Sequence, residues 1–320
     1  MLVSTELTSS DRWDHLRARV GYRRMEHLVV PGLYGVGAPS RASPVFVSAN
    51  YTLSFDALRV ALHDIDAFIL VLDTKGVNVW CAAGKGSFGT DELISKIGSS
   101  GLAERVDHRR LILPQLGAPG VAAHVVKRAT GFTVEYGPVR AGDIPEYLRL
   151  GRVTPEMRRV AFPLRDRAVL VPVEVVQSLK YLLPAMAVLL LVGGTGSMLI
   201  AVAAVLGGTA LFPLLLPYLP TKDFSSKGLI LGIAISLPFS CVHALDGHPL
   251  WGDMAYGVAI ALLVAPVVGY LGLNFTGCST STSRTGVRKE IFRWVPIMVV
   301  MVVAGAVLMA AVISGEMGWW

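Results

Sequence analysis

The chain has 320 residues, of which 53% are hydrophobic, more than an ordinary soluble protein carries. We therefore expect a membrane-embedded part beside a soluble one. The net charge is +6, yet Lys and Arg stand among acidic residues rather than in runs, which argues against nucleic-acid binding. Three widely separated cysteines do not suit a disulfide framework and favour a reducing compartment.

The first 174 residues alternate short β-branched runs with charged, helical stretches, which is typical of a parallel sheet covered by helices. We expect a doubly wound α/β domain of the Rossmann or flavodoxin type over residues 1–174. Its first twenty residues are charged and lack an apolar core, so we expect no signal peptide and a cytoplasmic position. The predicted strands are Val45–Ala49, Ala67–Asp73, Leu111–Pro114, Thr133–Tyr136 and Val169–Val173, and the predicted helices are Ser54–Leu62, Thr90–Ile97, Gly120–Lys127 and Ile144–Leu150.

The stretch that follows the second predicted strand contains the candidate ligand residue Cys81. Ligands of open α/β sheets bind beyond the carboxyl ends of the strands, so this thiol is placed to meet one. The alternative is that Cys81 packs as a small apolar residue behind Trp80, and the residues alone leave both interpretations open. Gly84 and Lys85 do not form a phosphate loop, because neither the preceding Gly nor the following Ser or Thr of that pattern is present.

The other strand ends supply further candidate ligand contacts. Glycine-rich loops there would let the backbone approach a bulky ligand closely, although the glycines could equally serve only as turns. The candidates are Asn50 and Tyr51 after the first strand, Thr74 after the second, Gln115 and Gly117 after the third, and Gly137, Val139 and Arg140 after the fourth.

From residue 175 onward, apolar stretches of roughly 20 residues predict an all-α domain of five membrane-spanning helices. Basic residues occupy alternate connections: Lys222 and Lys227 lie in the second, and Arg288 and Lys289 in the fourth. Because cytoplasmic loops retain Lys and Arg, we expect a multi-pass inner-membrane protein with the α/β domain inside and the carboxyl terminus outside. The predicted spans are 175–193, 198–219, 228–246, 254–273 and 294–313.

Residues 78–85 read Asn-Val-Trp-Cys-Ala-Ala-Gly-Lys. At every position this run resembles the cap-helix signature of the membrane-bound corrinoid proteins of the bacterial mercury-methylating pair, and the similarity extends over most of the first domain and the apolar tail. The resemblance implies a domain similar to the corrinoid-binding domain of the corrinoid iron-sulfur protein. It implies Cys81 as the lower axial ligand of cobalt, and as cofactor-binding cap residues Asn78, Val79, Trp80, Ala82, Ala83, Gly84 and Lys85.

For function, the resemblance implies methyl transfer from a methylated corrinoid to mercuric ion, giving methylmercury. It also implies a methylfolate-derived methyl donor and, as reductant, a ferredoxin-like protein with two 4Fe-4S clusters. Three dispersed cysteines cannot hold such a cluster in this chain. A thiolate is a soft, electron-donating ligand, which favours release of methyl toward an electrophile, although a radical route stays open.

Two other functions remain as alternatives. One is a corrinoid methyl carrier of one-carbon metabolism, and the other is a membrane transporter or sensor with a ligand-binding soluble domain. The predicted spans contain few ionisable residues, which argues against conduction. A histidine-ligated cobalamin is not indicated, because Trp251 replaces the Gly of the Asp-x-His-x-x-Gly signature that begins at Asp246.

Overall fold

The computed structural model describes the chain except residues 24, 280–282 and 317–320. It divides into two compact units, Met1–Val160 and Ala161–Trp320. The first is an α/β unit and the second is entirely helical. The predicted fold class is therefore confirmed.

A six-stranded sheet forms the centre of the α/β unit, with strands β1 (Leu2–Val3), β2 (Gly32–Val36), β3 (Val45–Ala49), β4 (Ala67–Leu72), β5 (Arg110–Leu113) and β6 (Thr133–Tyr136). Their order is β1-β2-β4-β3-β5-β6, in which β3 to β6 run parallel and β2 runs antiparallel to β4. From β3 the chain winds out to β4 and then returns to the other side of β3. The switch point, where such sheets bind ligands, therefore lies between the carboxyl ends of β3 and β5.

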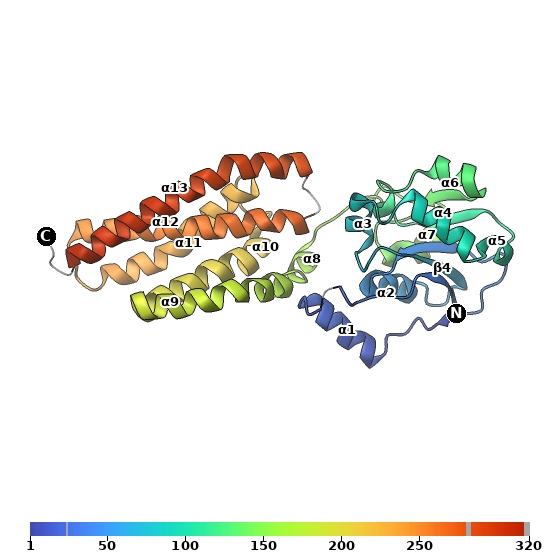
Figure 1. The fold of residues 1–320 in the computed structure, drawn as a ribbon, viewed down its shortest axis with the longest axis horizontal. Coiled ribbons are helices and arrows are strands. Elements are labelled where there is room, and N and C mark those ends of the chain that lie inside the picture. The colour runs from blue at the N-terminus through green and yellow to red at the C-terminus, as the bar shows by residue number, and fades with distance from the viewer. Residues whose placement is uncertain (24, 280–282, 317–320) are drawn as a thin grey trace. The chain divides into compact units, whose positions relative to one another are not determined.

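Helices cover both faces of this sheet (Figure 1). On one face α2 (Thr52–Ala61) and α7 (Ile144–Leu150) enclose a core that includes Phe55 and Ile69. On the other, α4 (Thr90–Ser99) and α6 (Ala123–Thr130) enclose a second core. Apolar side chains of the strands thus point alternately into two cores, as a buried sheet requires. The remaining helical elements are α1 (Ser9–Arg19), α3 (Val79–Lys85), α5 (Leu102–Arg105), η1 (Gln115–Gly117) and η2 (Ala141–Asp143).

One predicted strand is absent, and two observed strands, β1 and β2, were not predicted. The strand predicted at Val169–Val173 is wrong, since this segment joins α8 (Leu164–Ala168) to α9 (Val171–Leu206). Pro172 lies in the first turn of α9, where its fixed φ suits a helix start and its missing N–H costs nothing. Strand β2 was not predicted, because two glycines interrupt its apolar run and its hydrogen bonds come from pairing with β4.

The helical unit contains α8, α9, η3 (Gly207–Leu211), α10 (Phe212–Leu215), α11 (Phe224–Ala244), α12 (Leu250–Asn274), η4 (Phe275–Cys278) and α13 (Arg284–Glu316). Four helical stretches of the described chain are long and apolar enough to cross a membrane. They are Leu164–Leu215, Phe224–Ala244, Leu250–Gly277 and Thr285–Gly315.

The first of these stretches has 52 residues and folds back on itself. Arg167, near its start, donates a hydrogen bond from Nη1 to the carbonyl oxygen of Pro213, near its end. In a straight helix these residues would lie roughly 70 Å apart, at about 1.5 Å per residue. The reversal occurs at Gly194, whose φ of 68° and ψ of −168° are not helical, and Figure 1 shows the chain returning from there toward α10. The two predicted spans 175–193 and 198–219 are the two arms of this hairpin.

Candidate functional site

The short helix α3 begins and ends where its own sequence dictates. The preceding turn contains two residues with left-handed φ, Lys75 at 55° and Gly76 at 71°. Asn78 then caps the helix, because its side-chain oxygen accepts a hydrogen bond of 2.9 Å from the backbone N–H of Cys81. Gly86 ends the helix with φ at 88°. The run that carries the candidate cysteine is therefore a capped helix at the carboxyl end of β4.

Asn50 and Thr74 hold the turn from which α3 starts. Oδ1 of Asn50 accepts hydrogen bonds from the N–H and the hydroxyl of Thr74, both at 2.9 Å, and from the N–H of Gly76 at 3.1 Å. Both side chains are buried, so water does not compete for these hydrogen bonds. The switch-point residue Asn50 therefore positions the candidate site, and its amide also donates to Asp73.

The residues of α3 divide between its two faces. The inner face belongs to the apolar core and consists of Val79, Ala82 and Ala83. On the outer face two residues are half-buried, Trp80 and Cys81, and two are exposed, Gly84 and Lys85. Positions three and four apart share a helix face, so the outward face presents Trp80, Cys81, Gly84 and Lys85 together. Cys81 is a free thiol, and a Cβ added at Gly84 would meet no atom within 4 Å. One thiol thus lies beside a position that has no side chain.

The loop after β5 packs against the inner side of α3. A Cβ at Gly120 would lie 2.1 Å from the carbonyl oxygen of Phe88 and 3.0 Å from Cα of Ala83, so only glycine allows this approach. Gly117 is similarly close to the Phe88 ring, which is fully buried. Phe88 and Gly120 therefore support the site although they were not predicted as part of it. The glycine-rich sequence was the available signal, but it did not reveal which neighbour the glycines approach.

The remaining predicted residues lie at the same edge of the sheet but have different neighbours. Gln115 accepts a hydrogen bond of 3.1 Å from Nη1 of Arg158. Gly137 is buried and donates to the carbonyl oxygen of Leu113 at 2.8 Å, and the N–H of Val139 donates to Met157 at 2.8 Å. Tyr51 is half-buried at the start of α2, and Arg140 is exposed. The structure gathers Asn50, Thr74 and the turn before α3 into one hydrogen-bonded group, and it packs η1, which includes Gln115, against α3.

The donor set of the site limits what it can hold. A thiolate is a soft ligand that binds borderline and soft metals, but a single donor does not chelate an ion. A metal held at Cys81 must therefore bring its other ligands with it, as the metal of a macrocycle does. Because Gly84 has no side chain and no atom lies within 4 Å of its Cβ position, a broad, flat group can approach the helix backbone there.

Comparison with known proteins gives matches over the α/β unit. Residues 24–148 match the family described as the CO dehydrogenase/acetyl-CoA synthase delta subunit. The gamma subunit of the acetyl-CoA decarbonylase/synthase complex of Methanopyrus kandleri is 34% identical over 122 residues, which are 38% of this chain and 26% of the relative. The corrinoid/iron-sulfur protein large subunit of Moorella thermoacetica is 28% identical over 116 residues, 36% of this chain and 26% of the relative.

These matches concern a part of each protein. The chain spans about a quarter of the length of the curated relatives it matches. The family match ends at residue 148, before the helical unit begins. Within that range lie β2 to β6 and the helix α3 that carries Cys81. Residues 24–148 therefore form a corrinoid-protein-like domain.

Proposed function

We propose that the α/β unit binds a corrinoid and that the chain is a methyl carrier of one-carbon metabolism. The observation that carries this proposal is the half-exposed thiol of Cys81 beside Gly84, on a capped helix at the carboxyl edge of the sheet. The similarity of residues 24–148 to a corrinoid/iron-sulfur protein large subunit supports it. A single soft donor fits a metal whose remaining ligands come from a macrocycle.

The corrinoid would supply a cobalt that accepts and releases a methyl group. Within this proposal Cys81 would hold the cobalt through its sulfur as a thiolate, whose electron donation exceeds that of a neutral imidazole. Asn78 orients Cys81 through its hydrogen bond to the backbone N–H, and Asn50 fixes the turn that precedes it. The buried face of α3 keeps the helix on the sheet when the thiol is engaged.

We further propose mercuric ion as a methyl acceptor, so that the product is methylmercury. The basis is the resemblance of residues 78–85 to the cap-helix signature of the mercury-methylating corrinoid proteins. Four residues of this run, Trp80, Cys81, Gly84 and Lys85, form the outward face of α3. The methyl group would come from a methylfolate-derived donor system. The reductant would be a separate ferredoxin-like protein with two 4Fe-4S clusters, because the chain has only three cysteines.

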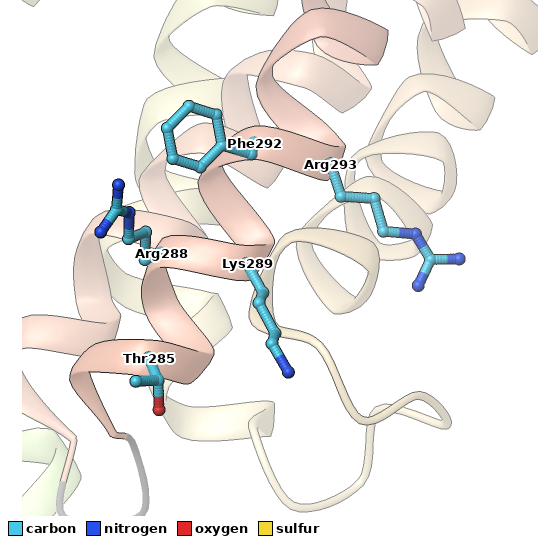
Figure 2. Close-up of a pocket in the computed structure, with 5 residues that line it drawn as sticks. All are labelled: Thr285, Arg288, Lys289, Phe292 and Arg293. Carbon is cyan, nitrogen blue, oxygen red and sulfur yellow. The ribbon is translucent and has the colours of Figure 1, made fainter.

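The helical unit is proposed to make this a multi-pass protein of the inner membrane, with the α/β unit in the cytoplasm. Arg288, Lys289 and Arg293 lie in the first turns of α13, and Figure 2 shows that they point in different directions around the helix. Diverging cations suit the headgroups of many lipids rather than one anion, and basic residues at a helix end favour the cytoplasmic side. The proposed external end, at Trp320, lies outside the described residues.

This orientation is tested by labelling intact cells with a membrane-impermeant thiol reagent. In a Cys241→Ser background, a cysteine replacing the exposed Lys222 is expected to stay unlabelled until the cells are broken. One replacing the exposed Asp246, in the connection between α11 and α12, is expected to react at once. The reverse pattern would overturn the proposed orientation.

The corrinoid proposal is tested on the full chain, purified in detergent without oxygen. We expect stoichiometric cobalt and a corrinoid absorption spectrum. Cys81→Ala should keep the corrinoid but shift the spectrum to that of a water-ligated form, because the thiolate is lost. Cys241→Ala is the matched control, since its exposed thiol lies in α11, and it should retain the parent spectrum.

The outcomes separate the parts of the proposal. A preparation without cobalt rejects the corrinoid function altogether. Superimposable spectra of the parent and Cys81→Ala reject only the axial role of the thiol. Methyl transfer to an acceptor of one-carbon metabolism, without formation of methylmercury in cells that contain the reductant, would reject mercuric ion as acceptor and leave the carrier function standing.

A further inference from the structure

The helical unit contains a group of ligating side chains that the proposed corrinoid function does not use. His243 lies at the end of α11, His248 in the connection after it, and Asp253 in the first turn of α12. One nitrogen of each histidine and one carboxylate oxygen of Asp253 all lie within 4.8 Å of one another. Eleven residues of sequence thus bring two imidazoles and a carboxylate together at one end of the helix pair.

Both imidazoles lie close to the same carboxylate oxygen. Nε2 of His243 lies 3.8 Å from Oδ1 of Asp253, and Nδ1 of His248 lies 3.9 Å from the same oxygen. Both distances exceed that of a hydrogen bond. Oδ1 of Asp253 and Nδ1 of His248 are inaccessible to solvent, and neither has a hydrogen-bond partner among the described residues. A buried polar atom without a partner is costly, so this arrangement calls for a ligand.

We propose that His243, His248 and Asp253 bind a divalent first-row transition ion, with zinc as the representative. Two imidazole nitrogens and one carboxylate oxygen form a donor set that zinc accepts, with a fourth position left for water. Ligand atoms around a tetrahedral zinc lie about 3.3 Å apart, given bonds of about 2.0–2.1 Å. The two nitrogen–oxygen distances of 3.8 and 3.9 Å therefore need to shorten by only about half an ångström. No pair of the three atoms needs to approach by more than about 1.5 Å, because all lie within 4.8 Å.

The surroundings indicate which side chain moves. The His243 ring stacks with the ring of His248, at a centroid distance of 4.5 Å, and with the ring of Tyr256, at 3.6 Å. The planes of the two histidine rings differ by only 8°, so the lone pairs of their nitrogens, which lie in the ring planes, are nearly parallel. One ring must rotate before both nitrogens can bind the same ion. His248 is carried by a loop and follows Gly247, which has a φ of 81°. We expect His248 to turn toward the ion while Tyr256 keeps His243 in place.

This site is independent of the proposed corrinoid function. It lies in the helical unit, whereas Cys81 belongs to the α/β unit. An ion here would tie the start of α12 to the end of α11 and to the loop between them. Binding should therefore stabilise the helical unit, since a ligand that binds only the folded state raises its stability.

The test uses the full chain in detergent, stripped with a chelator and titrated with zinc against a chromophoric competitor. We expect the parent to bind one zinc ion per chain. In two variants, His248→Ala and Asp253→Asn, the affinity for this ion should fall by at least about tenfold. Asp253→Asn keeps the size of the side chain and removes its charge. His124→Ala, which changes an exposed histidine of α6, is the matched control and should bind as the parent does.

X-ray absorption at the zinc edge identifies the ligands, because cysteine thiols also bind zinc. A shell of nitrogen and oxygen with imidazole scattering supports the site, and sulfur in the shell overturns it. The proposal is also overturned if the parent binds no zinc, or if Asp253→Asn binds it as tightly as the parent. Should His248→Ala fail to fold, Asp253→Asn and the zinc-dependent rise of Tm in the parent still decide the question.

Discussion

In the α/β unit the large apolar side chains lie inside, whereas in the helical unit many of them lie outside. Val45, Ile69 and Leu93 have no exposed surface, while Leu191 and Val192 in the α9 hairpin are 86% and 83% exposed. Glycine and alanine fill the helix contacts instead. A Cβ at Gly232 of α11 would lie 2.5 Å from Cα of Ala265 in α12.

This difference is the one expected between a unit that folds in water and helices long and apolar enough to cross a membrane. Water drives large side chains of the α/β unit into its cores. Lipid offers no such drive, so helices gain stability by close backbone approach, which small residues permit. An outward Leu on α9 is thus expected in a bilayer and would be unfavourable in water.

The two units also differ in the groups that surround the guanidinium of a buried arginine. Arg59 in α2 lies between two carboxylates, with Nε 2.6 Å from Asp56 and Nη2 2.9 Å from Asp11. Arg167 in α8 instead donates to backbone carbonyls of α10. The α/β unit neutralises its buried cation with side chains, whereas the helical unit uses helix-end carbonyls, which carry partial negative charge.

The largest effect is expected from a substitution that removes the ion pairs of Arg59. Arg59→Met should destabilise the α/β unit by about 3–5 kcal/mol, because it takes the guanidinium away from the buried carboxylate of Asp56 and leaves only His15 beside it. Arg41→Met is the control, since its ion pair with Asp107 is exposed, and it should cost no more than about 1 kcal/mol. Hydrogen exchange of the β3 and β4 amides measures both. Equal protection in the two variants would contradict the prediction.

A smaller effect should follow from Gly232→Ala in the helical unit. The added methyl group forces α11 away from α12, which should cost about 1–3 kcal/mol. Gly196→Ala in α9 is matched to it, because a Cβ there meets no atom within 4 Å. Thermal unfolding of the detergent-solubilised chain, followed by circular dichroism, should show a lower Tm for Gly232→Ala alone. Indistinguishable Tm values would mean that this helix contact adjusts freely.

The smallest effect concerns acid stability of the α/β unit. Burial alone would raise the pKa of Glu135, but hydrogen bonds from Tyr147 and Arg110 outweigh it and hold the pKa below its ordinary value. The stabilisation is therefore present above the unfolded pKa, about 4.3, and is lost as the pH falls through the lower folded value. Because Glu135 is about one-third exposed, it amounts to no more than about 1 kcal/mol.

Unfolding of Glu135→Gln and the parent between about pH 6 and pH 3 measures this contribution. The parent should lose the advantage that it holds over the variant as the pH falls. A constant difference across the range would show that the ionisation of Glu135 is not coupled to folding.

Much of the architecture could be predicted from the sequence, because it depends on local energies. The β-branched runs of β3 and β6 and the helix α7 have the predicted bounds. The bounds of the helix at residues 79–85 also depend on adjacent residues, since Asn78 is its N-cap and Gly86 its C-cap. Five apolar spans were predicted, whereas four helical stretches of the described chain are long and apolar enough to cross a membrane. The hairpin at Gly194 joins two of the predicted spans in one stretch.

What the sequence by itself determined is therefore the core strands β3 to β6, most of the helices that cover them and the apolar stretches, and that Cys81 follows a strand end, but not β2 or the helical state of residues 171–173. Only the tertiary structure decided that β2 pairs antiparallel with β4, that Asn50 holds the turn before α3, and that His243, His248 and Asp253 meet. Caps and helical periodicity act over four residues or fewer. Contacts between distant residues depend instead on how whole elements pack, and no local pattern encodes that.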